Sequence, residues 1–467
     1  MVFSSLTFLF FFLPTCLIAY YAFPQQKVRN CILIVFSIIF YAWGEPIWVV
    51  LLIFSAFWDY LNGRFIDRFR HRPAIARLGV VSSVIVNLSL LGTFKYADFI
   101  VNTVNDVTGL GFKPPGILLP VGISFYTFEA VSYVIDVYRG EVRAQRKLLS
   151  FMLFLINFPR LVAGPIVRYA HVAHEIEHRQ FNREDFSSGV TRFCRGLFKK
   201  VFIANNAGEL CQQFLGKGLE EATVSGEWFG LLMFSLQIYF DFSGYSDMAI
   251  GLGRMLGFHY RENFQHPYVS TSLTEFWRRW HISMGSFFRD YVYIPLGGNR
   301  RHATLNIIIV WALTGLWHGA SWNFIIWGLY FGAILLVEKN GLIGLLNRLP
   351  RVLRHIYALF FIVIGWAFFY FTNLDQLWRS LNVLFGATDA PLYGFQVGAA
   401  FWANALWLAL ALVLCMPTAS AIDGWLLRTC GARIQAGVEV MQNLVFLGLS
   451  VVLLVGQTYN PFIYFRF

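Results

Sequence analysis

Charged residues are scarce in this sequence: they make up 13% of its 467 residues, about half the share that is usual in soluble domains. So few charges cannot cover the surface of a water-soluble protein of this length. One very large soluble core is excluded as well, because such cores stop growing at roughly 250–300 residues. Hydrophobic residues account for 57%, and the mean hydropathy is +0.56. The excess apolar surface must face lipid, which predicts an all-α integral membrane protein.

Cysteine and the motifs of soluble enzymes are also rare. The six cysteines are widely spaced and form no C-x-x-C pair, so neither a disulfide framework nor a metal site is expected. The motifs of soluble enzymes are expected to be absent, namely the G-x-S-x-G elbow, the Walker A loop, H-E-x-x-H and a G-x-G-x-x-G between a strand and a helix. The net charge of +11 does not imply a nucleic-acid partner, because Lys and Arg gather in the cytoplasmic loops of membrane proteins. If the protein is an enzyme, histidine is its expected nucleophile or base.

The apolar segments predict about ten to twelve membrane crossings, since a helix needs about 20 apolar residues to cross the hydrocarbon. The first segment is expected to be a retained span, because no positive charge precedes Lys27 and no A-x-A cleavage site is present. Residues 148–165 contain Pro159 and Pro165 and predict a broken or re-entrant piece, whereas 197–216 either cross or lie at the interface. The candidate spans are 3–23, 31–43, 47–60, 78–95, 115–137, 227–252, 304–318, 322–338, 355–373, 399–416 and 437–456.

Basic residues are distributed unevenly between the loops. Twelve Lys or Arg lie between residues 139 and 200, and seven lie between 254 and 301. The stretches 96–114, 217–226 and 374–398 hold at most one each. By the positive-inside rule the basic loops are cytoplasmic, and the N-terminus starts outside.

The mixed segment 254–303 predicts a cytoplasmic layer of helices. Ser272 and Glu275 have the spacing of a capping box, in which the Ser accepts from the N3 amide and the Glu reaches back to the Ser amide. Apolar residues then recur at helical spacing as far as Phe288, so one amphipathic helix is expected at the cytoplasmic membrane face. The stretch 166–200 shows similar spacing and predicts a second such helix.

Two histidines are candidates for catalysis. His318 lies in an apolar run between Gly315 and Gly319, which keep the backbone slim enough for another helix or a substrate to approach. An ionisable group there is costly, so it either acts chemically or forms a hydrogen bond across a helix interface. His281 ends a string rich in Trp and Arg and, taken alone, is better explained as a residue at headgroup level.

Two carboxylates, Asp241 and Asp247, interrupt one apolar segment and cannot both face lipid. They are expected to pair with arginines, cap a kink near Gly244 or bind a cation, and structural support of the site is the favoured interpretation. Glu129 is a further candidate for a buried charge. Asp136, Arg160 and Arg168 are candidates as well, although Arg160 is equally well explained as a residue that extends to the interface.

Several strings of residues together point to one family. Trp317-His318-Gly319, the string Phe276–His281 and the string Tyr239–Asp247 resemble the membrane-bound O-acyltransferase (MBOAT) family. Further strings are similar to its bacterial branch, which is typified by the membrane subunit of alginate O-acetyltransferase. They are Met1–Ser5, Leu119–Phe125, Ala163–Pro165, Leu296–Arg300 and Pro461–Phe467, and the resemblance covers almost the whole chain.

The resemblance implies a single polytopic domain over residues 1–467, with tilted helices in a ring around a central tunnel. It comprises N-terminal spans (1–137), re-entrant and cytoplasmic helices (148–200), a catalytic core (227–338) and C-terminal spans (355–467). His318 is implied to be the essential catalytic residue, with His281 also needed on the cytoplasmic side. The residues expected to support the tunnel or the substrate are Trp317, Trp280, Asp241, Asp247, Arg278 and Arg279, and Trp322 is expected to line the tunnel with Trp317.

The implied activity is acetyl transfer across the bacterial inner membrane. The donor is cytoplasmic acetyl-CoA, with no tightly bound cofactor, and Arg300 and Arg301 lie on the side where this anion arrives. Periplasmic partner proteins then acetylate an exported polysaccharide. The region 373–436 is shorter than expected for alginate-type relatives, so alginate, cellulose, peptidoglycan and other exopolysaccharides all remain open as the polymer.

Two other classes of function compete with the enzyme. In a transporter or flippase of a lipid-linked sugar or acyl carrier, the carboxylates and histidines would form a proton or substrate path. Transporters usually show internal repeats, and none is visible in this sequence. A scaffold that only anchors an export complex would not need a histidine inside an apolar helix.

Overall fold

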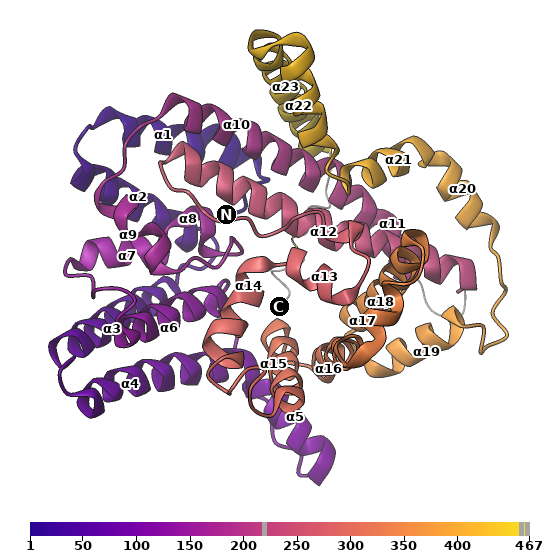
Figure 1. The fold of residues 1–467 in the computed structure, drawn as a ribbon, viewed down its shortest axis with the longest axis horizontal. Coiled ribbons are helices and arrows are strands. Elements are labelled where there is room, and N and C mark those ends of the chain that lie inside the picture. Colours follow the sequence, from indigo (N-terminus) through magenta and orange to yellow (C-terminus); the bar gives the residue numbers. More distant parts are fainter. Residues whose placement is uncertain (217–221, 457–461, 463–467) are drawn as a thin grey trace. The chain divides into compact units, whose positions relative to one another are not determined.

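The computed structural model describes residues 1–216, 222–456 and 462, and every regular element in these residues is a helix (Figure 1). The chain divides into two compact units. The first comprises Met1–Phe193 and Tyr245–Glu262, and the second comprises the described residues of Cys194–Gly244 and Asn263–Phe467. The all-α prediction is confirmed, whereas the single polytopic domain and the ring around a tunnel stay predictions.

Among the described residues, the first unit contains helices α1 to α9 and the greater part of α10. Helices α3, α4 and α6 pack side by side (Figure 1), and α6 is buried along most of its length. The helices are α1 (Leu13–Ala22), α2 (Gln26–Ala42), α3 (Val49–Arg68), α4 (Pro73–Leu91), α5 (Ala97–Thr108), α6 (Ile123–Arg139), α7 (Leu148–Ile156), α8 (Phe158–Leu161), α9 (Tyr169–Glu177) and α10 (Arg183–Phe198), with π-helical turns at Phe8–Phe12 and Gly92–Tyr96.

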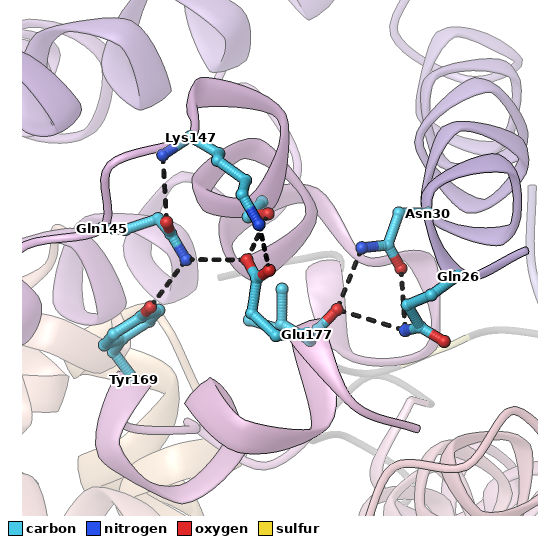
Figure 2. A network of polar contacts seen from close by, with 8 residues as sticks. Gln26, Asn30, Gln145, Lys147, Tyr169 and Glu177 are labelled. Atoms are coloured by element: carbon cyan, nitrogen blue, oxygen red, sulfur yellow. Dashed lines mark hydrogen bonds and ion pairs between the residues drawn. The ribbon is translucent and has the colours of Figure 1, made fainter. Parts of the chain in front are cut away.

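A polar network holds the end of α9 in place (Figure 2). The side-chain amide of Asn30 on α2 donates to the Ile176 carbonyl at 2.9 Å. The Gln145 amide donates to Glu177 at 3.3 Å, and Lys147 forms an ion pair with the same carboxylate. Because carbonyls at a helix end lack partners within the helix, these contacts fix where α9 lies in the first unit.

The second unit contains the remaining helices and both candidate histidines. Its α15 and α16 form an antiparallel hairpin, and α22 packs along α23 (Figure 1). Its elements are α11 (Asn205–Leu215), α12 (Val224–Met255, shared with the first unit), α13 (Leu273–Arg279), α14 (Ile282–Phe288), α15 (Ala303–His318), α16 (Trp322–Val337), α17 (Ile343–Leu346), α18 (Arg351–Tyr370), α19 (Leu374–Leu384), α20 (Phe395–Ala403), α21 (Ala405–Leu414), α22 (Thr418–Cys430) and α23 (Ala432–Gly456), with π-helical turns at Lys199–Ala204, Arg289–Tyr293 and Glu338–Leu342 and a 3₁₀ turn at Pro267–Val269.

Within the described residues, five helices are long and apolar enough to cross a membrane, and a sixth span results if one bent pair of helices is counted as one. Two further apolar helices are shorter. Each of these segments coincides with a predicted span, and the predicted spans at 31–43, 115–137 and 227–252 form the helices α2, α6 and α12. The total of ten to twelve crossings stays a prediction. The segments are Val49–Arg68, Pro73–Thr108, Trp322–Leu346, Arg351–Tyr370, Ala432–Gly456, the pair Phe395–Ala403 and Ala405–Leu414 (bent by 68°), Phe8–Ala22 and Ala303–His318.

The predicted broken segment is confirmed. Helix α7 ends at Ile156, the backbone turns at Asn157, and the one-turn helix α8 follows with Pro159 in its first turn. The predicted second amphipathic helix is the α-helix α10. Residues 217–221, and the closing string Pro461–Phe467 apart from Phe462, lie outside the described residues.

The predicted capping box is half correct. The N–H of Glu275 donates to Ser272 Oγ at 3.0 Å, as expected. The Glu275 carboxylate, however, accepts from the N–H of Thr271 at 3.0 Å rather than from that of Ser272. The Ser therefore caps α13, and the Glu orders the residue before the cap.

The single amphipathic helix expected after this cap is wrong. The chain forms α13 and α14 with a break at Trp280 and His281, and the φ of His281 is 44°. Tertiary hydrogen bonds replace the helical ones there, because the N–H of Ile282 donates to the Asn263 carbonyl at 2.9 Å. The break brings both Trp280 and His281 into the core, where a continuous interfacial helix would have exposed one side to solvent.

Candidate active site

His318 is the last residue of α15, at the turn that leads into α16. The two helices approach closely because glycines face the opposite backbone. A Cβ on Gly315 would overlap the Phe324 carbonyl, and a Cβ on Gly328 would overlap the Trp311 carbonyl. The prediction that Gly315 lets another helix approach is confirmed. His318 thus stands at the end of a tight helical hairpin.

Aromatic rings surround His318, whose exposed fraction is 2%. Its ring centroid lies 4.9 Å from that of Trp317, 4.9 Å from that of Trp327 and 5.3 Å from that of Phe369. Trp327 belongs to α16 and Phe369 to α18, so three helices determine the position of the imidazole.

His281 is completely buried, so protein atoms enclose its ring, and its depth in the membrane stays a prediction. Its Nδ1 lies 3.1 Å from Oδ1 of Asn263, which is also fully buried. Phe242 and Phe264 flank the ring, with centroids at 4.7 Å and 6.4 Å. Burial lowers the pKa of His281 to about 3, so the imidazole is neutral at physiological pH.

Trp317 connects the two histidines. Its ring centroid lies 5.9 Å from that of His281 and 4.9 Å from that of His318. The structure therefore brings three predicted site residues into one aromatic cluster of the second unit, although they come from separate segments.

Trp280 packs among further aromatic rings of the second unit. It contacts the rings of Phe264, Tyr268, Phe276 and Trp366. These contacts make Trp280 part of the wall that positions the α13–α14 break.

Asp241 forms a buried ion pair with Lys200, at 2.7 Å between Oδ1 and Nζ. Both side chains are almost inaccessible to solvent. Asp241 therefore pairs with a lysine, where the sequence predicted an arginine. Such a pair resists removal of one partner, because the other would remain as an unpaired buried charge.

Asp247 belongs to the first unit and pairs there with Arg192 at 2.8 Å. Arg192 also pairs with Glu262, so one guanidinium joins α10, α12 and the segment after α12. The expected pairing with an arginine is confirmed for Asp247. Its contacts support the first unit.

The predicted basic residues lie at the surface. Arg278 is exposed, whereas Arg279 is half-buried and pairs with Glu275 at 2.9 Å. Arg300 and Arg301 are exposed in the turn before α15. Trp322, expected beside Trp317 in the tunnel lining, has an exposed fraction of 47%.

The sequence analysis missed Glu338, a fully buried carboxylate at the end of α16. It accepts from the N–H groups of Leu273 at 2.7 Å and Thr274 at 2.8 Å. It thus binds the start of α13, where free N–H groups favour an anion. A lone Glu after an apolar run was the available signal, but its partner lies more than 60 residues away.

The expected absence of an H-E-x-x-H motif is wrong, because the string His174-Glu175-Ile176-Glu177-His178 has this spacing, which is typical of zinc proteases. Its carboxylates are used otherwise: Glu175 pairs with His259 and Glu177 with Lys147. No group of three potential metal ligands lies together in the part of the chain that the structure describes.

An apolar cavity of about 870 Å³ lies between α12, α18 and α21 in the second unit. Ser235, Tyr268 and His355 are among the few polar residues that line it. Within the described residues, none of the eight predicted site residues lines this cavity. The cavity is therefore not built from the histidine cluster.

Buried histidines in an aromatic cluster and several apolar helices define a multi-pass membrane protein with a candidate site for acyl transfer. The model of the MBOAT, membrane-bound O-acyltransferase family matches residues 142–375. That range contains His281, His318 and Trp317.

Relatives extend this match to the whole chain. The probable alginate O-acetylase AlgI of Azotobacter vinelandii is 39% identical, with 100% of both chains covered. The protein of the same name in Pseudomonas aeruginosa is 42% identical over 85% of this chain and 79% of its own. The peptidoglycan O-acetyltransferase of Helicobacter pylori is 33% identical over 84% of this chain and 81% of its own. The chain belongs to the membrane-bound O-acyltransferase family, and it is an acyltransferase.

Proposed function

We propose that this protein is an O-acetyltransferase of the bacterial inner membrane that serves the O-acetylation of an exported polysaccharide. The relatives named alginate O-acetylase support alginate as the polymer, and the peptidoglycan O-acetyltransferase supports the same chemistry on a different one. The observation that carries the proposal is the placement of His281, Trp317 and His318 in one buried cluster.

The proposed donor is cytoplasmic acetyl-CoA. In the transfer, the C–S bond of the thioester breaks and a bond forms between the acetyl carbon and an acceptor oxygen. The acceptor's hydroxyl proton passes to the imidazole of His318 and from there to the leaving thiolate. The acceptor is a periplasmic partner protein that carries the acetyl group to the polymer. The exposed Arg300 and Arg301 are proposed to attract the CoA phosphates.

The test uses the full chain in nanodiscs with radiolabelled acetyl-CoA, with and without the neighbouring periplasmic proteins. We expect His318→Ala to lower CoA release and label transfer by about 10²–10⁴-fold, the usual contribution of a general base. His281→Ala is measured in parallel. His71→Ala is the control, because His71 is an exposed histidine of the first unit, outside the histidine cluster.

The insertion and thermal unfolding of each variant show whether a loss is chemical or structural. Wild-type activity in a folded His318→Ala variant would contradict the catalytic assignment. Transport of a lipid-linked sugar by the wild type without any CoA release would favour the transporter instead.

A further inference from the structure

Asn263 places one oxygen atom against three potential donors. Its Oδ1 lies 3.2 Å from the backbone N of Ser283, 2.9 Å from Ser283 Oγ and 3.1 Å from His281 Nδ1. Its backbone carbonyl accepts from the N–H of Ile282 at 2.9 Å. Asn263 is therefore hydrogen-bonded to His281 and to both residues that follow it.

These contacts determine the orientation of the Asn263 amide. A backbone N–H can only donate, so the side-chain atom that faces Ser283 N must be the oxygen. The flipped amide would bring its NH₂ group against this N–H, with no acceptor between them. Because Oδ1 only accepts, His281 Nδ1 at 3.1 Å from it must carry a proton.

The protonation of the other ring nitrogen follows from the surroundings of His281. Phe242, Phe264 and Trp317 flank the ring, and His281 has no carboxylate contact within the described residues. The buried imidazole is neutral, since burial lowers its pKa. A neutral ring carries one N–H, so Nε2 holds a lone pair. This Nε2 is buried and has no hydrogen-bond partner in the part of the chain that the structure describes.

The backbone conformation of His281 is unfavourable for a residue other than glycine, so tertiary contacts must hold it. Its φ of 44° lies in the left-handed region, which residues other than glycine rarely adopt. The hydrogen bonds from Ile282 and Ser283 to Asn263 hold this conformation in place. Strained residues of this kind cluster at functional sites.

We propose that Asn263 is a positioning residue that holds His281 in the tautomer with the proton on Nδ1, so that His281 acts through Nε2 as a hydrogen-bond acceptor. This deepens the proposed function and, for its catalytic consequence, rests on it. During acetyl transfer the Nε2 of His281 is then a hydrogen-bond acceptor beside the reacting groups, while the hydroxyl proton of the acceptor passes to His318. His281 does not donate to the thioester carbonyl oxygen, and it is not a cationic anchor for CoA.

The test is nitrogen NMR on the full chain in nanodiscs, with ¹⁵N-labelled histidine and without any substrate. His281→Gln identifies the signals of His281 among those of the ten histidines. In the wild type at pH 7 we expect a protonated Nδ1 and an unprotonated Nε2. A proton on Nε2, or on both nitrogens, overturns the proposal.

Three variants show whether Asn263 is the cause. Asn263→Leu removes the acceptor, and we expect the Nδ1 tautomer to lose its dominance. Asn263→Asp retains an acceptor oxygen and should keep the proton on Nδ1. Ser283→Ala removes one hydroxyl but leaves the orienting backbone N–H, so it should preserve the wild-type tautomer. An unchanged tautomer in folded Asn263→Leu overturns the positioning role.

The tautomer of His281 that the NMR experiment measures does not depend on whether the proposed acetyl transfer takes place. The wild-type spectrum decides the tautomer even if Asn263→Leu fails to fold. If the wild type shows the expected tautomer but transfers no acetyl group, the proposed function fails and the assignment of His281 stands.

Discussion

The region around Arg192 in the first unit and the region around His281 in the second both contain polar side chains, which are partly exposed in the first region and fully buried in the second. Around Arg192 the partners are charged: Asp247 lies 2.8 Å away, and Glu262 pairs with the same guanidinium. Nearby in that unit, His259 lies 2.8 Å from Glu175 and 3.3 Å from Asp185. Around His281 the partners are an amide and aromatic rings.

The difference shows that tertiary partners set the protonation of each histidine. Burial lowers the pKa of His259, but the hydrogen bond to Glu175 and the charges of Glu175 and Asp185 outweigh it and raise the pKa above its ordinary value. His281 has no such carboxylate in contact among the described residues, and burial alone lowers its pKa to about 3. Ion pairs support the first unit, whereas the candidate active site keeps its imidazole uncharged. A neutral imidazole keeps one nitrogen free to accept a hydrogen bond, which a protonated imidazole cannot do.

The largest expected effect comes from breaking a charged pair inside the first unit. Arg160 and Glu129 form an ion pair in which both side chains are buried. Arg160→Ala leaves the Glu129 carboxylate buried and unpaired, which should destabilise the protein by about 3–5 kcal/mol. The measurement is thermal unfolding in detergent, followed by size-exclusion chromatography.

The double variant Arg160→Met with Glu129→Leu provides the control, because it removes both charges at similar volume. It should recover most of the lost stability. Equal destabilisation in the single and double variants would show that packing, rather than charge, holds this part of the first unit.

A smaller effect on stability is expected when a methyl group is added inside the α15–α16 hairpin that carries His318. Gly328→Ala places a methyl group against the Trp311 carbonyl and should push apart the hairpin that carries His318. Overpacking of this kind costs about 1–3 kcal/mol. We expect lower unfolding temperature together with lower acetyl transfer. Gly344→Ala is the matched control, since a Cβ there has no atom within 4 Å, and similar losses in both variants would contradict the expectation.

Loss of the α13 cap should cost about 1 kcal/mol. Ser272→Ala removes the acceptor for the Glu275 N–H, and a lost N-cap typically has this effect. Glu338 still binds the neighbouring N–H groups, so the helix should persist. Chemical denaturation of the purified chain gives the difference, with Ser286→Ala as the control. A loss of several kcal/mol would mean that the cap supports more than α13.

The smallest effect concerns His259, whose side chain is 51% exposed. Because its folded pKa is raised, the ion pairs stabilise the protein below pH 6.5, and this contribution is lost as the pH rises through the folded pKa. His259→Gln should therefore cost about 0.2–1 kcal/mol at pH 6, as exposed ion pairs do, and progressively less at higher pH. Unfolding curves at several pH values measure this, with exposed His71→Gln as the control. A loss that grows with pH would contradict the assigned sign.

The sign is opposite at His281. Its folded pKa of about 3 lies below the ordinary value of 6.5, so the unfolded chain gains a proton first on acidification. Stability that depends on His281 is complete above pH 6.5 and falls as the pH drops toward 3. The stability that depends on His259 is therefore lost as the pH rises, whereas the stability that depends on His281 is lost as the pH falls.

Composition and local spacing were sufficient for the membrane class, for most helices and for the Ser272 cap, because these follow from hydropathy and from contacts within a few residues. The same local signals also singled out His318, since a histidine in an apolar run is conspicuous. These local signals did not predict the partners of His281, Asp241 and Arg160. Asn263, Lys200 and Glu129 are polar residues at ordinary positions, and nothing in their spacing connects them to these partners.

Only the tertiary structure decided that α13 ends before His281 and that this histidine is buried. The helical spacing continues through Trp280 to Phe288, yet the hydrogen bonds that Ile282 and Ser283 donate to Asn263, together with the surrounding rings, outweigh the local preference for one helix. Hydropathy reports how much surface a segment must bury, and periodicity reports which face. Neither specifies which distant residue packs against that face. The charge state of a buried histidine depends on the identity of this partner.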